Sequence, residues 1–109
     1  MKYEHIIVFC TVPDTDTAHK LSKVLVEEKV AACCNIIPAV KSFYFWEENL
    51  QEDQELLLVI KTRQEVFPAL EIKIRENHPY SVPEILALPI IHGNHEYLKW
   101  MDDHVRSRK

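Results

Sequence analysis

The chain has 109 residues and a formal net charge of −4, with 13 Lys and Arg against 17 Asp and Glu. The length is that of one domain, residues 1–109. No basic stripe could neutralise phosphates, which argues against a nucleic-acid partner. No apolar run reaches the ~20 residues that span a bilayer, and the first residues do not resemble a signal peptide, so we expect a cytoplasmic protein with no membrane partner. Gly93 is the only glycine, which excludes a Walker loop and a dinucleotide fingerprint, because both need several glycines.

The first elements are a strand and a helix. Residues 4–12, EHIIVFCTV, are short, apolar and β-branched, which predicts a buried strand. Pro13 ends it, and Asp14 or Thr15 can cap the helix that follows. Apolar residues then recur at helical spacing to about residue 28.

The middle of the chain predicts a hairpin. Residues 30–46 are rich in β-branched and aromatic residues, which indicates a long strand. It is expected to bend at Pro38, because proline cannot donate to a ladder. EENLQED, residues 47–53, is predicted to be the turn, and residues 54–62 the partner strand.

A second helix is predicted over residues 63–78, with Pro68 allowed only in its first turn. Pro79 ends it, since the residue before a proline avoids helical geometry. Residues 83–91 predict a fourth strand, and Asn94 is expected to cap a last helix.

This order predicts an α+β fold: a ferredoxin-like βαββαβ unit with an additional C-terminal helix, an antiparallel sheet and its helices on one face. The predicted strands are apolar without alternation, which is typical of sheets covered on both faces. Two crossover helices would cover only one face. We therefore predict a homo-oligomer that packs its sheet faces together, because a monomer would expose a large apolar patch.

Two adjacent cysteines, Cys33 and Cys34, lie near the start of the second predicted strand. Neighbouring side chains of a strand point to opposite faces, so the two cannot chelate one ion. A buried free cysteine behaves as a small hydrophobic residue, and this is the role that we expect for both.

Cys10 and His78 are the candidate metal ligands. Cys10 lies near the end of the first strand and His78 at the end of the second helix, and the predicted chain directions bring these ends together. Thiolate and imidazole suit copper or zinc, but a third ligand must come from water, another side chain or another subunit. The alternative is a packed Cys10 and a His78 imidazole near the negative pole of its helix.

Several sequence blocks identify a family resemblance. These are TVPD, AACCNIIP, SFYFWEENL, LLLVIKTR, NHPYSVPEILALPI and EYLKWMDD, in this order. They resemble the CutA divalent-cation-tolerance proteins over about residues 5–105. The resemblance implies a ferredoxin-like fold, a tight homotrimer, a cytoplasmic location and binding of copper or another divalent cation. Two copper ligands proposed for bacterial members fall on Cys10 and His78, whereas a third falls on Asn77, a poor ligand for a soft metal.

Three functions follow as hypotheses. The first is a trimeric divalent-cation (copper)-binding protein involved in metal-ion tolerance. The second is a signalling or scaffold trimer like the PII proteins, which would bind a small anionic ligand between subunits through Lys61, Tyr80 or Trp46. The third, an enzyme, would need a thiolate activated by histidine, but no orienting group is evident and we expect no enzyme. Glu84 is predicted to form a structural ion pair.

Overall fold

The computed structural model describes residues 3–107 of the chain. Its elements alternate in the order βαββαβα, with one short 3₁₀ segment. They are β1 His5–Val12, α1 Thr15–Glu27, β2 Cys33–Trp46, β3 Asn49–Arg63, the 3₁₀ turn η1 Gln64–Val66, α2 Phe67–Asn77, β4 Leu86–Pro89 and α3 His95–His104.

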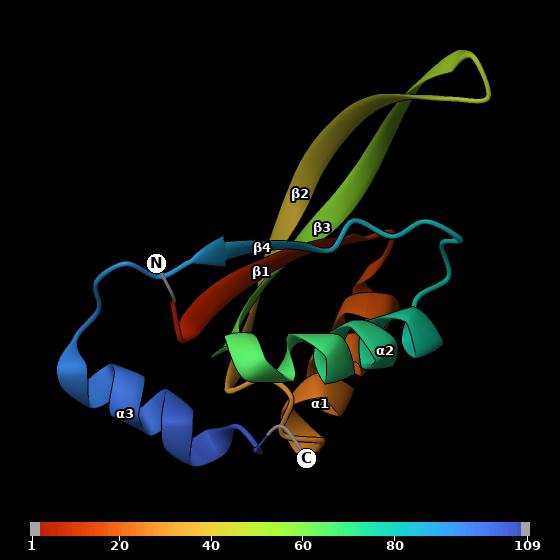
Figure 1. Ribbon diagram of the computed structural model, residues 1–109. Coiled ribbons are helices and arrows are strands. Elements are labelled where there is room, and N and C mark those ends of the chain that lie inside the picture. Colours follow the sequence, from red (N-terminus) through yellow and green to blue (C-terminus); the bar gives the residue numbers. More distant parts are fainter. Residues whose placement is uncertain (1–2, 108–109) are drawn as a thin grey trace.

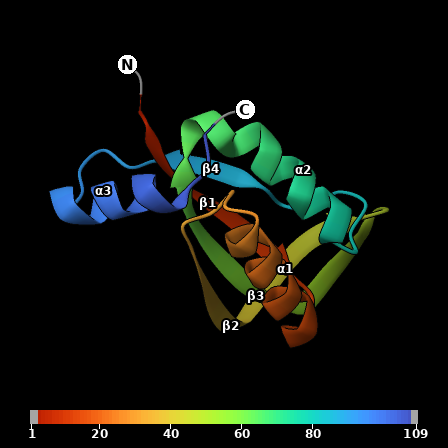
Figure 2. The ribbon, with the colours of Figure 1, turned by 90° about the horizontal axis from the view of Figure 1, so that it is seen from below.

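The strands form one antiparallel sheet in the order β2-β3-β1-β4. Helices α1 and α2 lie side by side under one face of this sheet (Figures 1 and 2). The α+β class and the antiparallel sheet predicted from the sequence are confirmed. Because β1 and β2 both run antiparallel to β3, they point the same way, as the chain directions required.

The core lies between the sheet and its two helices. Strand β1 alternates between buried and partly buried residues along its whole length. Its buried residues pack against the apolar stripes of α1 and α2. The fully buried side chains include Val8, Cys10, Leu21, Leu58, Leu70 and Ile74.

The predicted helix starts are confirmed. The Asp14 side chain accepts a hydrogen bond from the Thr17 amide at 2.7 Å, and Asn94 accepts one from the Tyr97 amide at 3.0 Å. Each bond satisfies an amide that has no partner inside its own helix. Pro68 falls in the first turn of α2, where its missing N–H costs no helical bond.

The hairpin differs from the prediction at its tip. Residues 49–53 belong to β3, so the turn is only Glu47 and Glu48, and the predicted turn over residues 47–53 was wrong. Both glutamates have positive φ, as two-residue hairpin turns require. Such turns usually carry Asn or Gly, and neither Glu47 nor Glu48 is a residue that signals one.

The predicted bend at Pro38 is present. The ladder between β2 and β3 shifts register between Ile37 and Val40, and Ala39 adopts a positive φ of 61°. Beyond this bulge, β3 has only β2 as a neighbour, because β1 pairs no further than Leu56. Residues 40–55 therefore form a two-stranded projection, here called the arm, which extends past the sheet (Figure 1).

Strand β4 and helix α2 are shorter than predicted, and β2 begins at Cys33 and not at residue 30. Strand β4 covers only Leu86–Pro89 of the predicted residues 83–91, and it pairs with β1 alone. The second helix begins as the 3₁₀ turn η1 and ends at Asn77, one residue before His78. Strand β4 ends at Pro89 and α2 ends two residues before Pro79, and proline restricts continuation of either element.

Helix α3 packs at the end of the sheet. Its buried residues Met101 and Val105 contact Ala32 and Val66. Asp102 accepts a hydrogen bond from His5 at 2.8 Å and lies 3.4 Å from the Arg63 guanidinium. No helix within residues 3–107 combines the length and the apolar character needed to cross a membrane.

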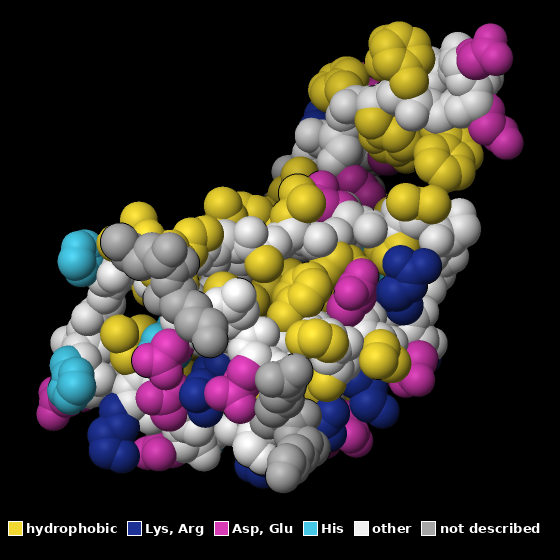
Figure 3. Space-filling view, in the orientation of Figure 1, with side chains coloured by type: hydrophobic (Ala, Val, Ile, Leu, Met, Phe, Trp, Pro, Cys, Tyr) yellow, Lys and Arg dark blue, Asp and Glu magenta, His cyan; other side chains and the backbone are white. Residues whose placement is uncertain are grey.

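The face of the sheet opposite α1 and α2 is apolar and incompletely covered. Cross-strand partners share a face, so the registers assign residues to it. Its apolar members, here called the open face, are Ile7, Phe9, Ile37, Leu57, Val59, Leu86 and Leu88, all of them exposed or partly exposed. Hydrophobic side chains also extend along the arm (Figure 3). Cys33 is on this side, paired with Lys61, whereas Cys34 packs against the core, as predicted.

Candidate functional site

The end of β1 brings together the two residues predicted as metal ligands. His78 directly follows α2 with an extended backbone, and its ring turns back toward β1. Its Nε2 lies 2.8 Å from the Thr11 carbonyl oxygen, while its Nδ1 accepts the Tyr80 amide at 3.1 Å. A carbonyl can only accept and an amide can only donate, so this pattern specifies the neutral ring with its hydrogen on Nε2.

Cys10 lies beside the same carbonyl. Its Sγ is 3.8 Å from the Thr11 oxygen, and the residue is fully buried. Burial raises the pKa of the Cys10 thiol to about 12, and the charges of Glu84, Cys34 and Glu55 act in the same direction. Cys10 is therefore a protonated thiol at neutral pH, whereas metal binding requires the thiolate.

The structure thus places Cys10 and His78 at one end of the sheet but commits both to the protein interior. Both nitrogens of His78 have hydrogen-bond partners. The part of the chain that the structure describes holds no group of three or more His, Cys, Asp or Glu able to hold a metal. Asn77, where the family resemblance places a histidine, donates its side-chain amide to the Lys73 carbonyl at 2.9 Å.

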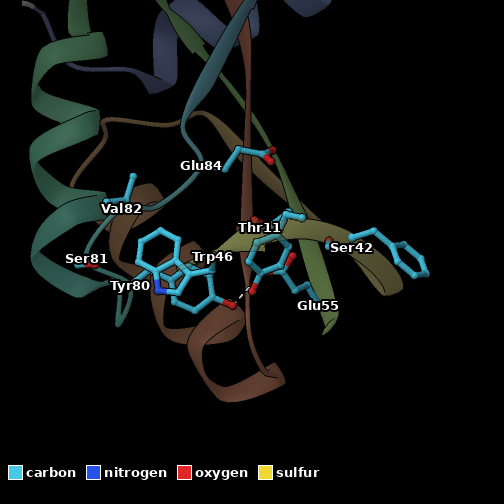
Figure 4. A pocket seen from close by; sticks show the side chains of 10 residues that line it. Thr11, Ser42, Trp46, Glu55, Tyr80, Ser81, Val82 and Glu84 are labelled. Carbon is cyan, nitrogen blue, oxygen red and sulfur yellow. Dashed lines mark hydrogen bonds between the residues drawn. The ribbon is translucent and has the colours of Figure 1, made fainter. Parts of the chain in front are cut away.

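Beside this pair, a pocket of about 610 Å³ opens between the arm and the segment that follows α2 (Figure 4). We call it the acidic pocket. It is lined by Thr11 from β1, by Ser42, Phe43, Tyr44, Trp46 and Glu55 from the arm, and by Tyr80, Ser81, Val82 and Glu84. Four of these side chains are aromatic and two are carboxylates, and none of the described lining residues is Lys or Arg.

Glu55 and Tyr80 form the floor of the acidic pocket. The Tyr80 hydroxyl donates to Oε2 of Glu55 at 2.8 Å, shown as the dashed line in Figure 4, and Glu55 is only 5% exposed. Burial and this hydrogen bond raise the pKa of Tyr80, which keeps the hydroxyl protonated as a donor. The Tyr80 ring also packs against His78, with ring centroids 4.8 Å apart. The side chains of Glu55 and Tyr80 therefore connect the pocket to His78.

Glu84 is the second carboxylate. Partial burial raises its pKa, and the nearby charge of Glu55 raises it further. A like charge nearby disfavours ionisation of a carboxyl group. No described basic residue in the lining offsets the two charges, so Glu84 does not form the structural ion pair predicted for it within this pocket. The arrangement attracts cations.

The sequence located part of this site. Three residues that were singled out from the sequence line the pocket: Trp46, Tyr80 and Glu84. Lys61 does not; it bonds the side-chain oxygen of Asn35 near the C-terminal end of β3, away from the pocket. The charge around Trp46 and Tyr80 is consequently the opposite of that needed for the predicted small anionic ligand. Sequence reasoning missed Glu55, whose only signal is a charge at the start of an otherwise apolar strand.

Comparison with known proteins identifies the family. The family described as CutA1 divalent ion tolerance protein matches residues 6–104. The divalent-cation tolerance protein CutA of Thermus thermophilus is 50% identical over 95 residues, covering 87% of this chain and 92% of that protein. The Arabidopsis thaliana protein named CutA, chloroplastic, is 45% identical over 94% of this chain and 56% of its own length.

A solved structure agrees. The crystal structure of CutA1 from the psychrotrophic bacterium Shewanella sp. SIB1 has a TM-score of 0.95 against this chain, with 41% sequence identity. The match covers 98% of this chain and all of that one. The chain therefore belongs to the CutA1 divalent ion tolerance protein family.

Proposed function

We propose that the chain assembles as a homotrimer and binds divalent cations, copper among them, as its contribution to metal-ion tolerance. Family membership supports the role in tolerance. The observation that carries the cation site is the acidic pocket, where two carboxylates meet without a described basic partner. We also propose a cytoplasmic location, which stays a prediction from the sequence.

The open face supports the assembly. Ile37, Leu86 and Leu88 are 45%, 59% and 45% exposed, and they adjoin further apolar residues of the same face. Leaving several hundred Å² of apolar surface in water forgoes on the order of 10 kcal/mol, at about 25 cal/mol per Å². Strands β2 and β4 are sheet edges, whose free backbone groups can pair with another copy. The number of copies, three, follows from the family resemblance.

The arm adds to this surface. Phe43, Phe45 and Leu50 are each more than 60% exposed, on a projection that lengthens the molecule to 44 Å against 27 and 23 Å in the other directions. Soluble monomers rarely expose contiguous apolar patches of this kind. We propose that a neighbouring copy covers part of the arm together with the open face.

Sedimentation equilibrium tests the assembly. We expect the wild type to sediment at three times the 12.8 kDa chain mass at micromolar concentration. Leu86→Asp should shift the protein toward smaller species, because it places a charge in the open face. Ile72→Asp is the matched control: Ile72 is similarly exposed, at 57%, but lies on α2. A folded 12.8 kDa wild-type species, or equal effects of the two substitutions, would refute the proposal.

For the cation, two sets of donors lie within the same site. Glu55 and Glu84 offer carboxylate oxygens, which suit magnesium, calcium and manganese, while the stability order for divalent metals favours copper(II). Cys10 and His78 offer sulfur and nitrogen, but His78 must first release Thr11 or Tyr80. We therefore propose that the carboxylates bind first and that Cys10 and His78 can join only after this rearrangement.

Calorimetric titration with copper(II) and with manganese(II) separates these donors. We expect Glu84→Gln to weaken binding at least tenfold and Cys10→Ser to change it little. If Cys10→Ser and His78→Ala abolish binding while Glu84→Gln does not, the thiol and imidazole are the ligands and the carboxylate proposal fails. Equal affinity in all variants would remove this site altogether.

The proposal is of a binding protein and not of an enzyme. A catalytic cysteine needs a lowered pKa, through a nearby positive charge or a helix N-terminus. Burial and two glutamates instead raise the pKa of Cys10 to about 12. These surroundings act against nucleophilic catalysis by Cys10.

A further inference from the structure

The acidic pocket has features that a bare metal ion does not use. A hydrated divalent cation needs oxygen donors and water, yet four aromatic side chains line this pocket. Its volume of about 610 Å³ lies within the range of pockets that hold small organic molecules, roughly 300–1,000 Å³. From this combination we propose that the acidic pocket binds an organic amine, best a diamine, whose ammonium groups face Glu55 and Glu84.

Glu55 provides the buried charge. Its side chain is nine-tenths or more buried, and Tyr80 occupies Oε2. A buried carboxylate is stabilised by charge-assisted hydrogen bonds and by a nearby opposite charge. An ammonium group, with up to three N–H donors, would supply both to Glu55.

Trp46 and Tyr80 provide the aromatic walls. Both side chains project into the same part of the pocket (Figure 4). The faces of aromatic rings attract cations within about 6 Å of the ring centre, and tryptophan does so most strongly. The methylene groups of an alkylamine can in turn pack against these rings and against Val82, which is 69% exposed in the free chain.

Charge complementarity selects an amine over an anion or a neutral molecule. Glu84 already has a raised pKa because of partial burial and the charge of Glu55. A bound dication would offset both carboxylate charges and relieve this repulsion. An anionic ligand would add a third negative charge to the same space.

This inference shares Glu55 and Glu84 with the proposed metal site but needs no metal. The test is calorimetry in buffer containing EDTA, with 1,4-diaminobutane as the probe and 1,4-butanediol as its neutral counterpart. We expect the wild-type assembly to bind the diamine and not the diol. Because the chelator removes divalent metal, success or failure here is independent of the copper and manganese titrations.

Three variants assign the contacts. Glu84→Gln removes one charge with little change of shape and should weaken diamine binding about tenfold. Trp46→Leu keeps an apolar side chain but removes the ring, and should weaken it ~3- to 10-fold. Glu48→Gln is the matched control, a glutamate at the tip of the same arm that does not line the pocket, and should leave binding unchanged.

Three results would overturn the inference. The first is no detectable binding of the diamine to the wild type. The second is equal binding of diamine and diol, which would show that charge is not recognised. The third is an equal effect of Glu48→Gln and Glu84→Gln, which would indicate general attraction to an acidic protein surface and not binding in the pocket.

Discussion

Replacing His78 by alanine tests whether this ring is a structural bridge. The ring links the Thr11 carbonyl to the Tyr80 amide and packs on the Tyr80 ring, and His78 is only 8% exposed. A typical hydrogen bond contributes about 0.5–1.5 kcal/mol, and leaving its buried partner unsatisfied costs about 1–3 kcal/mol. With two such bonds lost, we expect His78→Ala to lower the free energy of unfolding by about 2–4 kcal/mol.

Urea denaturation in EDTA, at one fixed chain concentration, measures this loss. The concentration must be fixed because assembly shifts apparent stability. His92→Ala is the matched control: His92 is exposed, and the change should stay within about 0.5 kcal/mol. His78→Gln should recover part of the loss, since its amide can still donate to Thr11. The bridge is refuted if His78→Ala matches the wild type in EDTA and loses stability only relative to metal-loaded protein.

Further expectations concern the cysteines, the core and α3. At pH 8 a thiol of pKa about 12 has a thiolate fraction near 10⁻⁴, against about 10⁻¹ for a pKa of 9.0. Iodoacetamide should therefore modify Cys10 at least ~1,000-fold more slowly than free cysteine. Peptide mapping that shows ordinary modification rates would contradict this. The pKa values of Cys10 and Cys34 are both raised from 9.0 to about 12 in the folded chain, so their stabilising effect is complete below pH 9 and is lost as pH rises toward 12. The free energy of unfolding should fall by about 0.7 kcal/mol per pH unit for each thiol at pH 9 and by about 1.4 kcal/mol well above it, and Cys10→Ala should roughly halve this slope in urea titrations at pH 9–10.5. Leu58→Ala should cost about 2–5 kcal/mol by opening a cavity in the core, and a change below 1 kcal/mol in the same assay would contradict the packing. Asn94→Ala should cost about 0.5–2 kcal/mol by removing the cap on the Tyr97 amide, with faster amide exchange confined to the start of α3.

The sequence was sufficient for the order of the elements and for most of their starts. Strands and helices bury apolar residues at different spacings, so the positions of the apolar residues in the sequence indicate which element each segment forms. Asn94 was identified as a cap, and Asp14 as one of two candidates beside Thr15, because short polar side chains suit that position. The sequence also predicted that Cys10 and His78 lie at the same end of the sheet, because the order of the elements sets the direction of each one.

The hairpin tip and the charge of the pocket could not be predicted in the same way. Glu47 and Glu48 adopt positive φ without the residues that usually announce such a turn, so the strand pairing on either side must fix their backbone. Glu55 lies opposite Tyr80 only because the arm returns over the segment after α2. That contact joins residues 25 positions apart and depends on three-dimensional placement, which no local pattern encodes.

The positive φ angles of the chain have a consequence for its thermal tolerance. Gly93 is the only glycine, yet Lys29, Ala39, Glu47 and Glu48 adopt the left-handed backbone that glycine usually supplies. Each such residue stores roughly 1–2 kcal/mol of conformational strain. The fold therefore holds unused stabilising capacity at its bends, and asparagine or glycine at these positions offers a route to a more heat-resistant protein that leaves the core and the acidic pocket unaltered.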